Sequence, residues 1–529
     1  MSMFSSLRVD LPSGIYRQKR STGIAVYQYT RHFRDKNGKS RHQSSMIGIL
    51  DEISGLLIPN DNYFKINGIV PPVSDFHNVI QYGYPFAFYH LCESLGLTSI
   101  LSDIFPNSWK DMITAACYIL LEGSTMDYID CWQEDSFSLS SHQLNGKSIS
   151  RLFASINDEH IHYFFTKWVQ KFSDNDCYFY DVTSISSYSG NLDYAEYGYN
   201  RDHEDLAQIN IGMFCHNVTR LPVYYEVYNG SLTDKMNLPY VIENIKEIGI
   251  RNISLIMDGG FFDKERISSL DKEPYTYTMG MPSHLKISKE IIKRYGHNMT
   301  TYENKLHRHP EYCLNLKEDI YGKEKRVLLC YNEVLHSDMM NGLMEKLELM
   351  DEELGALKKY PKNHEKRYMK YFKLTKTDDG FEYSKDIDKI NEICDTFGYF
   401  LLCGNDFETD AEELLYYYRA KDADEKIFMA IKNYMEGNRV RTHNDITTKG
   451  KIFIIFLALI IRTELYKKIE DYLIKHHMSL KKALRKLNDI RVVENEEGIR
   501  LLKCITKEQK ELLSLIGIDK LLENSITLK

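Results

Sequence analysis

The chain has 529 residues, which is too long for one compact hydrophobic core, so two to four domains are expected. Hydrophobic residues make up 43% and charged residues 27%, an ordinary globular composition. The formal net charge of -8 argues against a uniformly basic nucleic-acid-binding protein. Positive charge is nevertheless concentrated locally. Residues 1–50 hold nine Lys or Arg against two acidic residues, and residues 432–491 hold fourteen against six.

The ten cysteines are dispersed, without a CxxC pair or a short Cys/His cluster. This pattern predicts free thiols in a reducing cytoplasm and argues against a structural zinc site. The N-terminus lacks the apolar core of a signal peptide. The longest apolar run, Ile452–Ile461, is too short to span a bilayer and predicts a buried helix. We therefore expect a soluble intracellular protein that does not contact a membrane.

The N-terminal third divides into two expected regions. Residues 1–70 form a basic β segment, in which 15–50 alternate polar and apolar residues around a turn at Asp35–Gly38, as in a β-hairpin. Residues 71–172 change to helical periodicity, clearest at 86–97, 112–121 and 161–172.

The next part of the chain has the pattern of alternating strands and helices. Three strands, a helix and further strands form the opening of a ribonuclease-H-like fold, so we expect 173–282 to be the first part of an α/β core. The expected strands are 177–182, 208–215, 221–228, 253–257 and 275–279, with a helix at 238–248.

The remainder is expected to complete this core around an insertion. Residues 283–398 are charged and mixed, which indicates an inserted domain. The second part of the core, 399–466, begins with a strand at 399–403 and continues with a long helix over 411–435. The C-terminal region, 467–529, is predicted to be helical.

Asp181 lies in the run FYDVTS. A carboxylate within an apolar strand is costly to bury unless it is paired or binds a cation. Taken alone, such an aspartate is more often a hydrogen-bond acceptor at a strand end.

Asp258 directly follows the strand 253–257 and precedes Gly259 and Gly260. The tip of a strand in an α/β fold is the usual position of functional residues. Asp-Gly is also a common turn dipeptide, so both interpretations remain open.

Four polar residues share one face of the helix expected at 411–435: Tyr418, Lys421, Glu425 and Lys432. At 100° per residue they fall within a sector of about 60°, opposite an apolar face. A solvated ladder of charges would give the same pattern.

Three motifs in this order resemble a known family. The run Tyr418–Lys432 resembles the Y-x2-R-x3-E-x6-K signature of bacterial DDE transposases of the insertion-sequence-four superfamily. FYDVTS resembles the strand that carries the first aspartate of that family, and LIMDGGFF at 255–262 resembles the second. The family's arginine is Lys421 here, which keeps the charge but loses the bidentate fork used on phosphate.

The resemblance implies a ribonuclease-H-like (retroviral-integrase-like) catalytic core and metal-dependent cutting and joining of DNA. Asp181, Asp258 and Glu425 would be the catalytic and metal-binding carboxylates, holding two Mg²⁺ ions that Mn²⁺ could replace. Tyr418, Lys421 and Lys432 would contact DNA phosphates.

The implied partners are the terminal inverted repeats of a mobile element and target DNA, bound by a homodimer in the bacterial cytoplasm at the nucleoid. We assign recognition of the repeats, as a hypothesis, to the helical domain 71–172 and to the basic segment 1–50. Two alternatives stay open. One is an inactive transposase-derived DNA-binding protein, to which Lys421 points. The other is a ribonuclease-H-fold nuclease that does not join strands.

Overall fold

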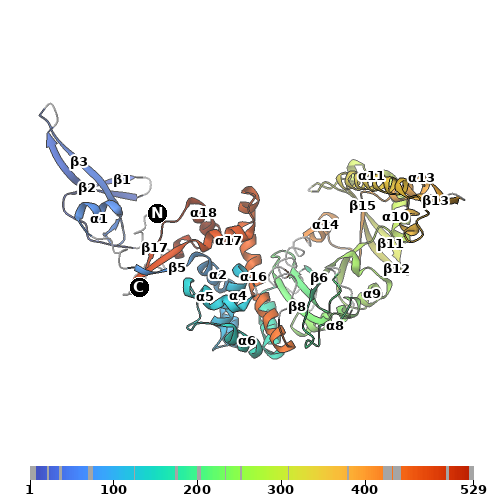
Figure 1. Ribbon diagram of the computed structural model, residues 1–529, viewed down its shortest axis with the longest axis horizontal. Helices are drawn as coiled ribbons and strands as arrows, with labels where there is room; N and C mark the ends of the chain where they lie inside the picture. The colour runs from blue at the N-terminus through green and yellow to red at the C-terminus, as the bar shows by residue number, and fades with distance from the viewer. Residues whose placement is uncertain are drawn as a thin grey trace.

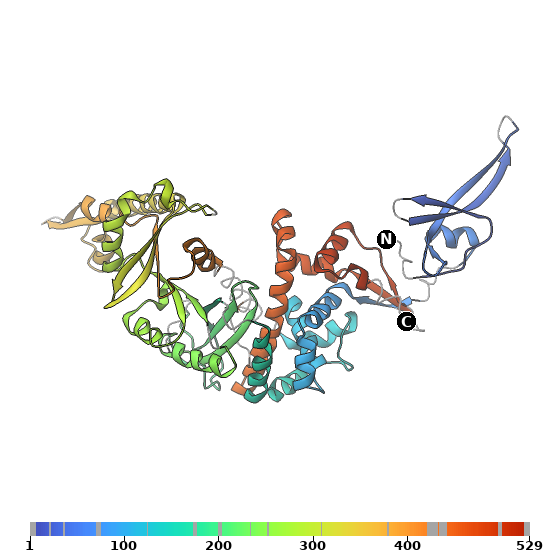
Figure 2. The same ribbon diagram turned by 180° about the vertical axis from the view of Figure 1, so that it is seen from behind.

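The computed structural model describes residues 7–20, 23–34, 38–69, 76–123, 125–172, 177–198, 204–232, 234–250, 253–307, 309–377, 380–420, 432, 442–495 and 500–522. The molecule is elongated. Its N-terminal sheet lies at one end, a helical region in the middle, and a large sheet with its attached helices at the other end (Figures 1 and 2).

The N-terminal region is a small sheet covered by one helix. Its four strands have the order β1-β2-β3-β4 and all neighbours are antiparallel. The elements are β1 (Ile15–Arg20), β2 (Gly23–Arg34), β3 (Ser40–Leu50), β4 (Leu57–Pro59) and α1 (Asp61–Asn67). The expected hairpin corresponds to β2 and β3. The sequence pattern did not predict β1, β4 or α1 as separate elements. Its turn residues 35–37 lie outside the described residues.

A separate small core holds this region together. Val26 and Ile47 of the sheet pack with Tyr63 and Phe64 of α1. Two residues from the far end of the chain, Val493 and Leu501, belong to the same cluster. The N-terminal sheet is therefore attached to the C-terminal strands by apolar packing.

The middle of the molecule is helical. Its elements from the first half of the chain are β5 (Phe76–Gln81), α2 (Gly83–Ser94), α3 (Leu97–Ile104), α4 (Trp109–Glu122), α5 (Ile129–Asp135), α6 (Gly146–Ser155) and α7 (Asp158–Trp168). Those from the end of the chain are α16 (Asp445–Lys475), α17 (Leu480–Asn488), β16 (Arg491–Asn495), β17 (Arg500–Leu502) and α18 (Lys507–Ile516).

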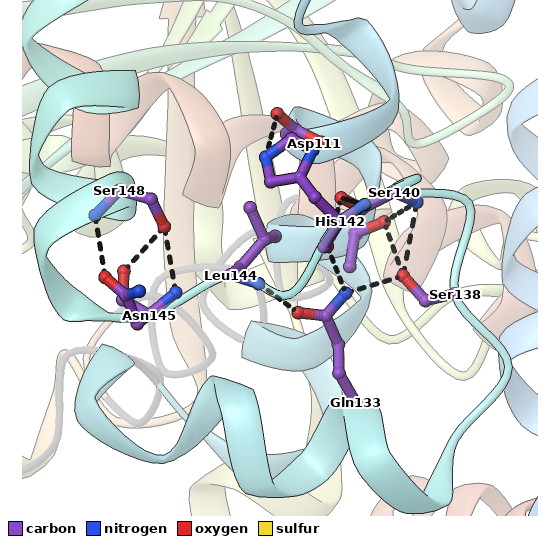
Figure 3. A network of polar contacts seen from close by, with 9 residues as sticks. Asp111, Gln133, Ser138, Ser140, His142, Leu144, Asn145 and Ser148 are labelled. Carbon is purple, nitrogen blue, oxygen red and sulfur yellow. Dashed lines mark hydrogen bonds and ion pairs between the residues drawn. The ribbon is translucent and has the colours of Figure 1, made fainter.

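The loop between α5 and α6 is fixed by side-chain hydrogen bonds. The Gln133 amide donates to Ser138 Oγ (3.0 Å) and accepts from the Leu144 backbone (2.7 Å), while Asn145 and Ser148 form the capping box that begins α6 (Figure 3). A loop held at several points keeps α5 and α6 in a defined orientation.

Helix α16 is the centre of the helical region. Every residue of Ile452–Ile461 is at most 4% exposed, because α2, α4, α6, α18 and β8 surround the helix. The buried helix expected for this run is confirmed. Within the described part of the chain, none of the helices combines the length and apolar character needed to cross a membrane.

The C-terminal region differs from its helical prediction. β16 and β17 are strands, and β16 pairs antiparallel with β5 from the first half of the chain. The boundary expected at residue 466 falls inside α16. Strand pairing across the whole chain is a tertiary effect, which local periodicity does not report.

The central sheet has eight strands in the order β11-β12-β15-β10-β9-β6-β7-β8. The strands are β6 (Cys177–Ser186), β7 (Gln208–His216), β8 (Pro222–Asn229), β9 (Ser254–Met257), β10 (Thr276–Met281), β11 (Tyr312–Ile320), β12 (Lys323–Tyr331) and β15 (Tyr399–Gly404). β6, β7 and β8 are antiparallel neighbours, whereas β9 is parallel to β6 and β10 is parallel to β9. The mixed α/β class predicted from the sequence is confirmed, and these five strands have the order expected of a ribonuclease-H-like core.

Helices cover both faces of this sheet. On one side lie α8 (Asp234–Glu247) and α9 (Lys264–Leu270); on the other lies α14 (Ala411–Ala420). The stripe Leu238, Val241, Ile242 and Ile245 has the helical spacing that buries one face of α8. With both faces covered, every residue of β7 is buried.

The expected insertion is only partly separate from the core. β11 and β12 extend the central sheet beyond β15, and Cys313 and Cys330 form a disulfide across them. The expectation of free thiols is wrong for these two residues, because antiparallel register places them directly opposite each other. The rest of the insertion packs around its own small cluster and comprises α11 (Glu333–Ala356), α12 (Glu365–Tyr368), β13 (Phe372–Thr377), β14 (Gly380–Lys385) and α13 (Ile387–Cys394).

Candidate active site

Asp181 occupies an unusual position in the central strand. β6 is buried at every position except Cys177 and Asp181, which are half-buried. The backbone N–H of Val182 donates to Asp181 Oδ1 over 2.8 Å. The carboxylate is therefore held within an apolar strand at the one interior position that solvent reaches.

Asp258 lies at the open end of the neighbouring strand. β9 ends at Met257, and Asp258 keeps an extended backbone (φ -75°, ψ 163°) before the turn Gly259–Phe261. Its side chain is exposed. The strand-end position predicted from the sequence is thus the observed one.

The two aspartates are neighbours across the sheet. β6 and β9 are parallel, and their last paired residues are Tyr180 and Met257. Asp181 and Asp258 are the next residue of each strand, so their α-carbons continue the same register. Neighbouring strands lie about 4.8 Å apart, which brings two carboxylates from distant parts of the sequence side by side.

Both aspartates lie on the face that α14 covers. Phe179 and Ile256, two residues before Asp181 and Asp258, pack in one cluster with Leu414 and Leu415 of α14. Side chains two residues apart on a strand share a face. The helix that is expected to carry the third carboxylate, Glu425, therefore begins on the same face of the sheet as Asp181 and Asp258.

Tyr418 is positioned beside Asp258 by a glycine. A β-carbon at Gly280 would collide with the Tyr418 hydroxyl and would lie 3.0 Å from the backbone nitrogen of Gly259. The absence of a side chain at Gly280 therefore lets the phenol approach the turn that follows Asp258. Asp258, Gly259, Gly280 and Tyr418 together line a pocket of about 470 Å³.

Glu425 and Lys421 lie outside the described residues. α14 is described as far as Ala420. Lys432 is a half-buried helical residue, and the residues on either side of it in the sequence lie outside the described part of the chain. Within the described ranges no three His, Cys, Asp or Glu residues form a metal-binding group. The structure thus brings together Asp181, Asp258 and Tyr418 of the six predicted site residues.

An ion pair that the sequence analysis missed fixes the end of α14. Glu311 is fully buried, accepts a hydrogen bond from Asn332 Nδ2 (2.7 Å) and pairs with Arg419. Arg419 and Asn332 also line the pocket that contains Asp258. Because Glu311 and Arg419 are 108 residues apart in sequence, no spacing rule could have linked them.

Comparison with models of protein families identifies one family. The family model described as "Transposase DDE domain" matches residues 173–461, more than half of the chain. No curated protein sequence matches the chain at a significant level.

Among solved structures, the piggyBac transposase in a synaptic complex with hairpin DNA is similar at 12% identity and a TM-score of 0.35, covering 84% of this chain and 85% of that one. The Mos1 mariner transposase in a paired-end complex with Mn is similar at 12% identity and a TM-score of 0.15, covering 31% of this chain and 53% of that one. On the family match, this chain belongs to the transposases with a DDE domain.

Proposed function

We propose that this transposase cuts the ends of a mobile element and joins the freed 3′-hydroxyls to target DNA, with Asp181, Asp258 and Glu425 as its catalytic carboxylates. The observation that carries the proposal is the register of β6 and β9, which places Asp181 beside Asp258 on the face that α14 covers. Glu425 follows five residues after the last described residue of α14, in the same predicted helix.

The donor set at this site fits hard divalent cations. Two carboxylates on adjacent strands offer oxygen ligands, which Mg²⁺ and Mn²⁺ prefer. Asp181, Asp258 and Glu425 would hold two such ions. When bound, the ions supply activation of the attacking oxygen and charge stabilisation of the leaving oxygen.

The protein's own side chains position the DNA. Asp181 is held by its strand and by the Val182 N–H, while Asp258 is exposed to an incoming backbone. Tyr418 lines the same pocket as Asp258, so a phosphate bound there would meet its hydroxyl. Lys421 and Lys432 would add positive charge, and Lys421 would contact phosphate without the bidentate geometry of arginine.

Cleavage of a duplex tests this proposal. The substrate is a labelled duplex copied from the DNA that borders the coding region, which contains the element's ends. With Mg²⁺, the protein is expected to cut it and join the 3′ end to a second duplex. Asp181→Asn, Asp258→Asn and Glu425→Gln should each lower the cleavage rate at least about a thousandfold, because bound ions supply several kcal/mol of charge stabilisation.

The matched control is Glu265→Gln, an exposed carboxylate in the first turn of α9. It should leave cleavage unchanged. Binding without cleavage by the unaltered protein would replace the proposal with an inactive DNA-binding protein. Cleavage without joining would replace it with a plain nuclease. A homodimer bridging two ends is expected in the productive complex.

A further inference from the structure

The three N-terminal strands β1, β2 and β3 carry positive charge without any negative charge. Together they contain six arginines and lysines and not one aspartate or glutamate. The cationic positions are all exposed: Arg17, Lys19, Arg20, Arg31, Arg34 and Arg41. This composition opposes the net charge of -8 of the whole chain.

β2 and β3 continue as a two-stranded ribbon beyond the small core that anchors them. The core residues Val26 and Ile47 lie in the lower half of these strands. From Thr30 to Arg34 and from Ser40 to Gln43, every residue is exposed. At about 3.4 Å per residue this part extends for roughly 15 Å, and it projects from the end of the molecule (Figures 1 and 2).

A row of rings stiffens this ribbon. Tyr16 stacks on Tyr27 with centroids 5.1 Å apart and lies 5.3 Å from Tyr29. Tyr29 in turn contacts His42 at 4.6 Å and His32 at 5.7 Å. Cross-strand ring pairs stabilise antiparallel strands, whereas a bare hairpin is marginal in water. The row therefore carries the order of the small core out to the exposed part.

Protection against edge-to-edge aggregation is the simplest explanation for cations on exposed strands. A second exposed hairpin in the same chain, β13–β14, shows how such protection looks here. Its Lys373 and Lys385 pair with Asp386 (3.5 Å) and Asp351 (3.7 Å), and β14 itself carries Glu382. The N-terminal strands lack such acidic residues, and Phe33 is 45% exposed between Arg31 and Arg41. Protection alone does not account for this difference.

We propose that the β2–β3 ribbon lies in the major groove of duplex DNA at the element's ends. The inference rests on the proposed function for the identity of the DNA. The major groove, about 12 Å wide, admits a two-stranded β-ribbon. With the ribbon seated there, Arg31, Arg34 and Arg41 reach the phosphates that border the groove.

Salt-dependent binding of the full-length protein tests the inference. The probe is the same labelled duplex from the DNA that borders the coding region, measured without divalent cations so that cutting does not interfere. Removing three arginine–phosphate contacts makes the slope of log K against log salt less steep by roughly 2 to 3. Arg31→Gln/Arg34→Gln/Arg41→Gln should show this change and should lose protection of guanine N7, a major-groove atom, from methylation.

The matched control removes three exposed lysines that follow α11, a helix at the opposite end of the molecule from the ribbon (Figure 1), as Lys358→Gln/Lys359→Gln/Lys362→Gln. Its slope and its N7 protection should equal those of the unaltered protein. Because the ribbon arginines are exposed, the thermal midpoint of the ribbon variant should also be unchanged, which shows that it folds.

An unchanged slope and unchanged N7 protection in the ribbon variant would overturn the inference, as would preferential binding of duplex RNA, whose major groove is too narrow and deep for the ribbon. Either result leaves the proposed function intact if the unaltered protein still cuts the duplex. Failure of the unaltered protein to cut, with ribbon-dependent binding retained, would instead overturn the proposed function alone.

Discussion

The N-terminal sheet and the central sheet treat their polar residues in opposite ways. At the centre of the large sheet both faces are covered, so β7 is buried throughout and β6 opens to solvent within its length only at Asp181. In the N-terminal sheet one face packs on α1, and the outer halves of β2 and β3 are exposed on both faces. The central strand of one sheet opens only at an acidic position, and the other sheet exposes arginines on the outer halves of its longest strands.

Under the two proposals made above, this difference corresponds to two kinds of contact with DNA. A reaction centre needs carboxylates fixed by surrounding packing, because small displacements are costly to catalysis. Phosphate contacts need exposed charge and tolerate variation, since each contributes a similar electrostatic amount. The comparison predicts that substitutions in the central sheet change stability or chemistry, whereas those in the ribbon change DNA affinity alone.

The largest effect on stability is expected from replacing a buried phenylalanine of the central sheet, with an exposed phenylalanine of the ribbon as its control. Phe179 of β6 is 1% exposed and Phe33 of β2 is 45% exposed. Phe179→Ala should lower the free energy of unfolding by about 3 to 5 kcal/mol, because it leaves a cavity between the sheet and α14. Phe33→Ala should change it by less than about 0.5 kcal/mol. Denaturant titration of both variants measures the two values, and equal losses would contradict the comparison.

The next largest loss of stability is expected from removing the buried negative charge of Asp271. The Asp271 side chain, directly after α9, is 5% exposed and pairs with Lys325 and Lys323 of β12, the latter at 3.1 Å. Tyr277 Oη donates to it over 2.7 Å. Burial alone would raise the pKa of Asp271, but the hydrogen bonds from Lys325, Tyr277 and Lys323 outweigh it and hold this pKa below its usual 3.8. Asp271→Asn should cost about 2 kcal/mol at neutral pH, because Lys325 stays buried without its counter-charge.

The pH dependence of this cost has a defined sign. A carboxyl group with a lowered pKa stabilises the folded protein above its unfolded pKa and loses that contribution as the pH falls through its folded pKa. The difference in thermal midpoint between Asp271→Asn and the unaltered protein should therefore stay constant near neutral pH and narrow only below about pH 4. Arg31→Gln, at the exposed ribbon, should show no such difference at any pH. A gap that widens on acidification would refute the assignment.

The smallest effect is expected from one methyl group beside the candidate active site. Gly280→Ala would push against the Tyr418 hydroxyl and the turn after Asp258, and should slow cleavage about tenfold with little loss of stability. Gly260→Ala is the matched control, since a β-carbon at Gly260 meets no atom within 4 Å. Comparing single-turnover cleavage rates decides the matter, and identical rates for the two variants would mean that Tyr418 does not position the substrate.

Local patterns were sufficient to predict strands of the core and the position of Asp258 at the end of one of them. β6, β9 and β15 lie close to their expected ranges, because short apolar runs bounded by polar residues encode strands locally. The neighbourhood of Asp181 and Asp258 could be expected only from the resemblance, since 77 residues of chain separate two positions that the register then brings together.

Pairing between distant segments could not be predicted in the same way. β16 and β17 were expected to be helical, and their strand character depends on β5. β11 and β12 were assigned to a separate insertion, yet they complete the edge of the central sheet. The buried partner of Arg419, Glu311, is distant in sequence for the same reason.

The strand pairing of β5 with β16 has a consequence for folding during translation. Gln81 and Asn488, joined by a side-chain hydrogen bond, are 407 residues apart, so the N-terminal sheet is translated long before Val493 and Leu501, on which it packs. Nascent chains that stop before residue 491 would carry the N-terminal sheet without the C-terminal strands β16 and β17, to which it is attached. Such fragments should fold slowly and present unpaired strand edges, which makes them targets for chaperones rather than competitors for DNA.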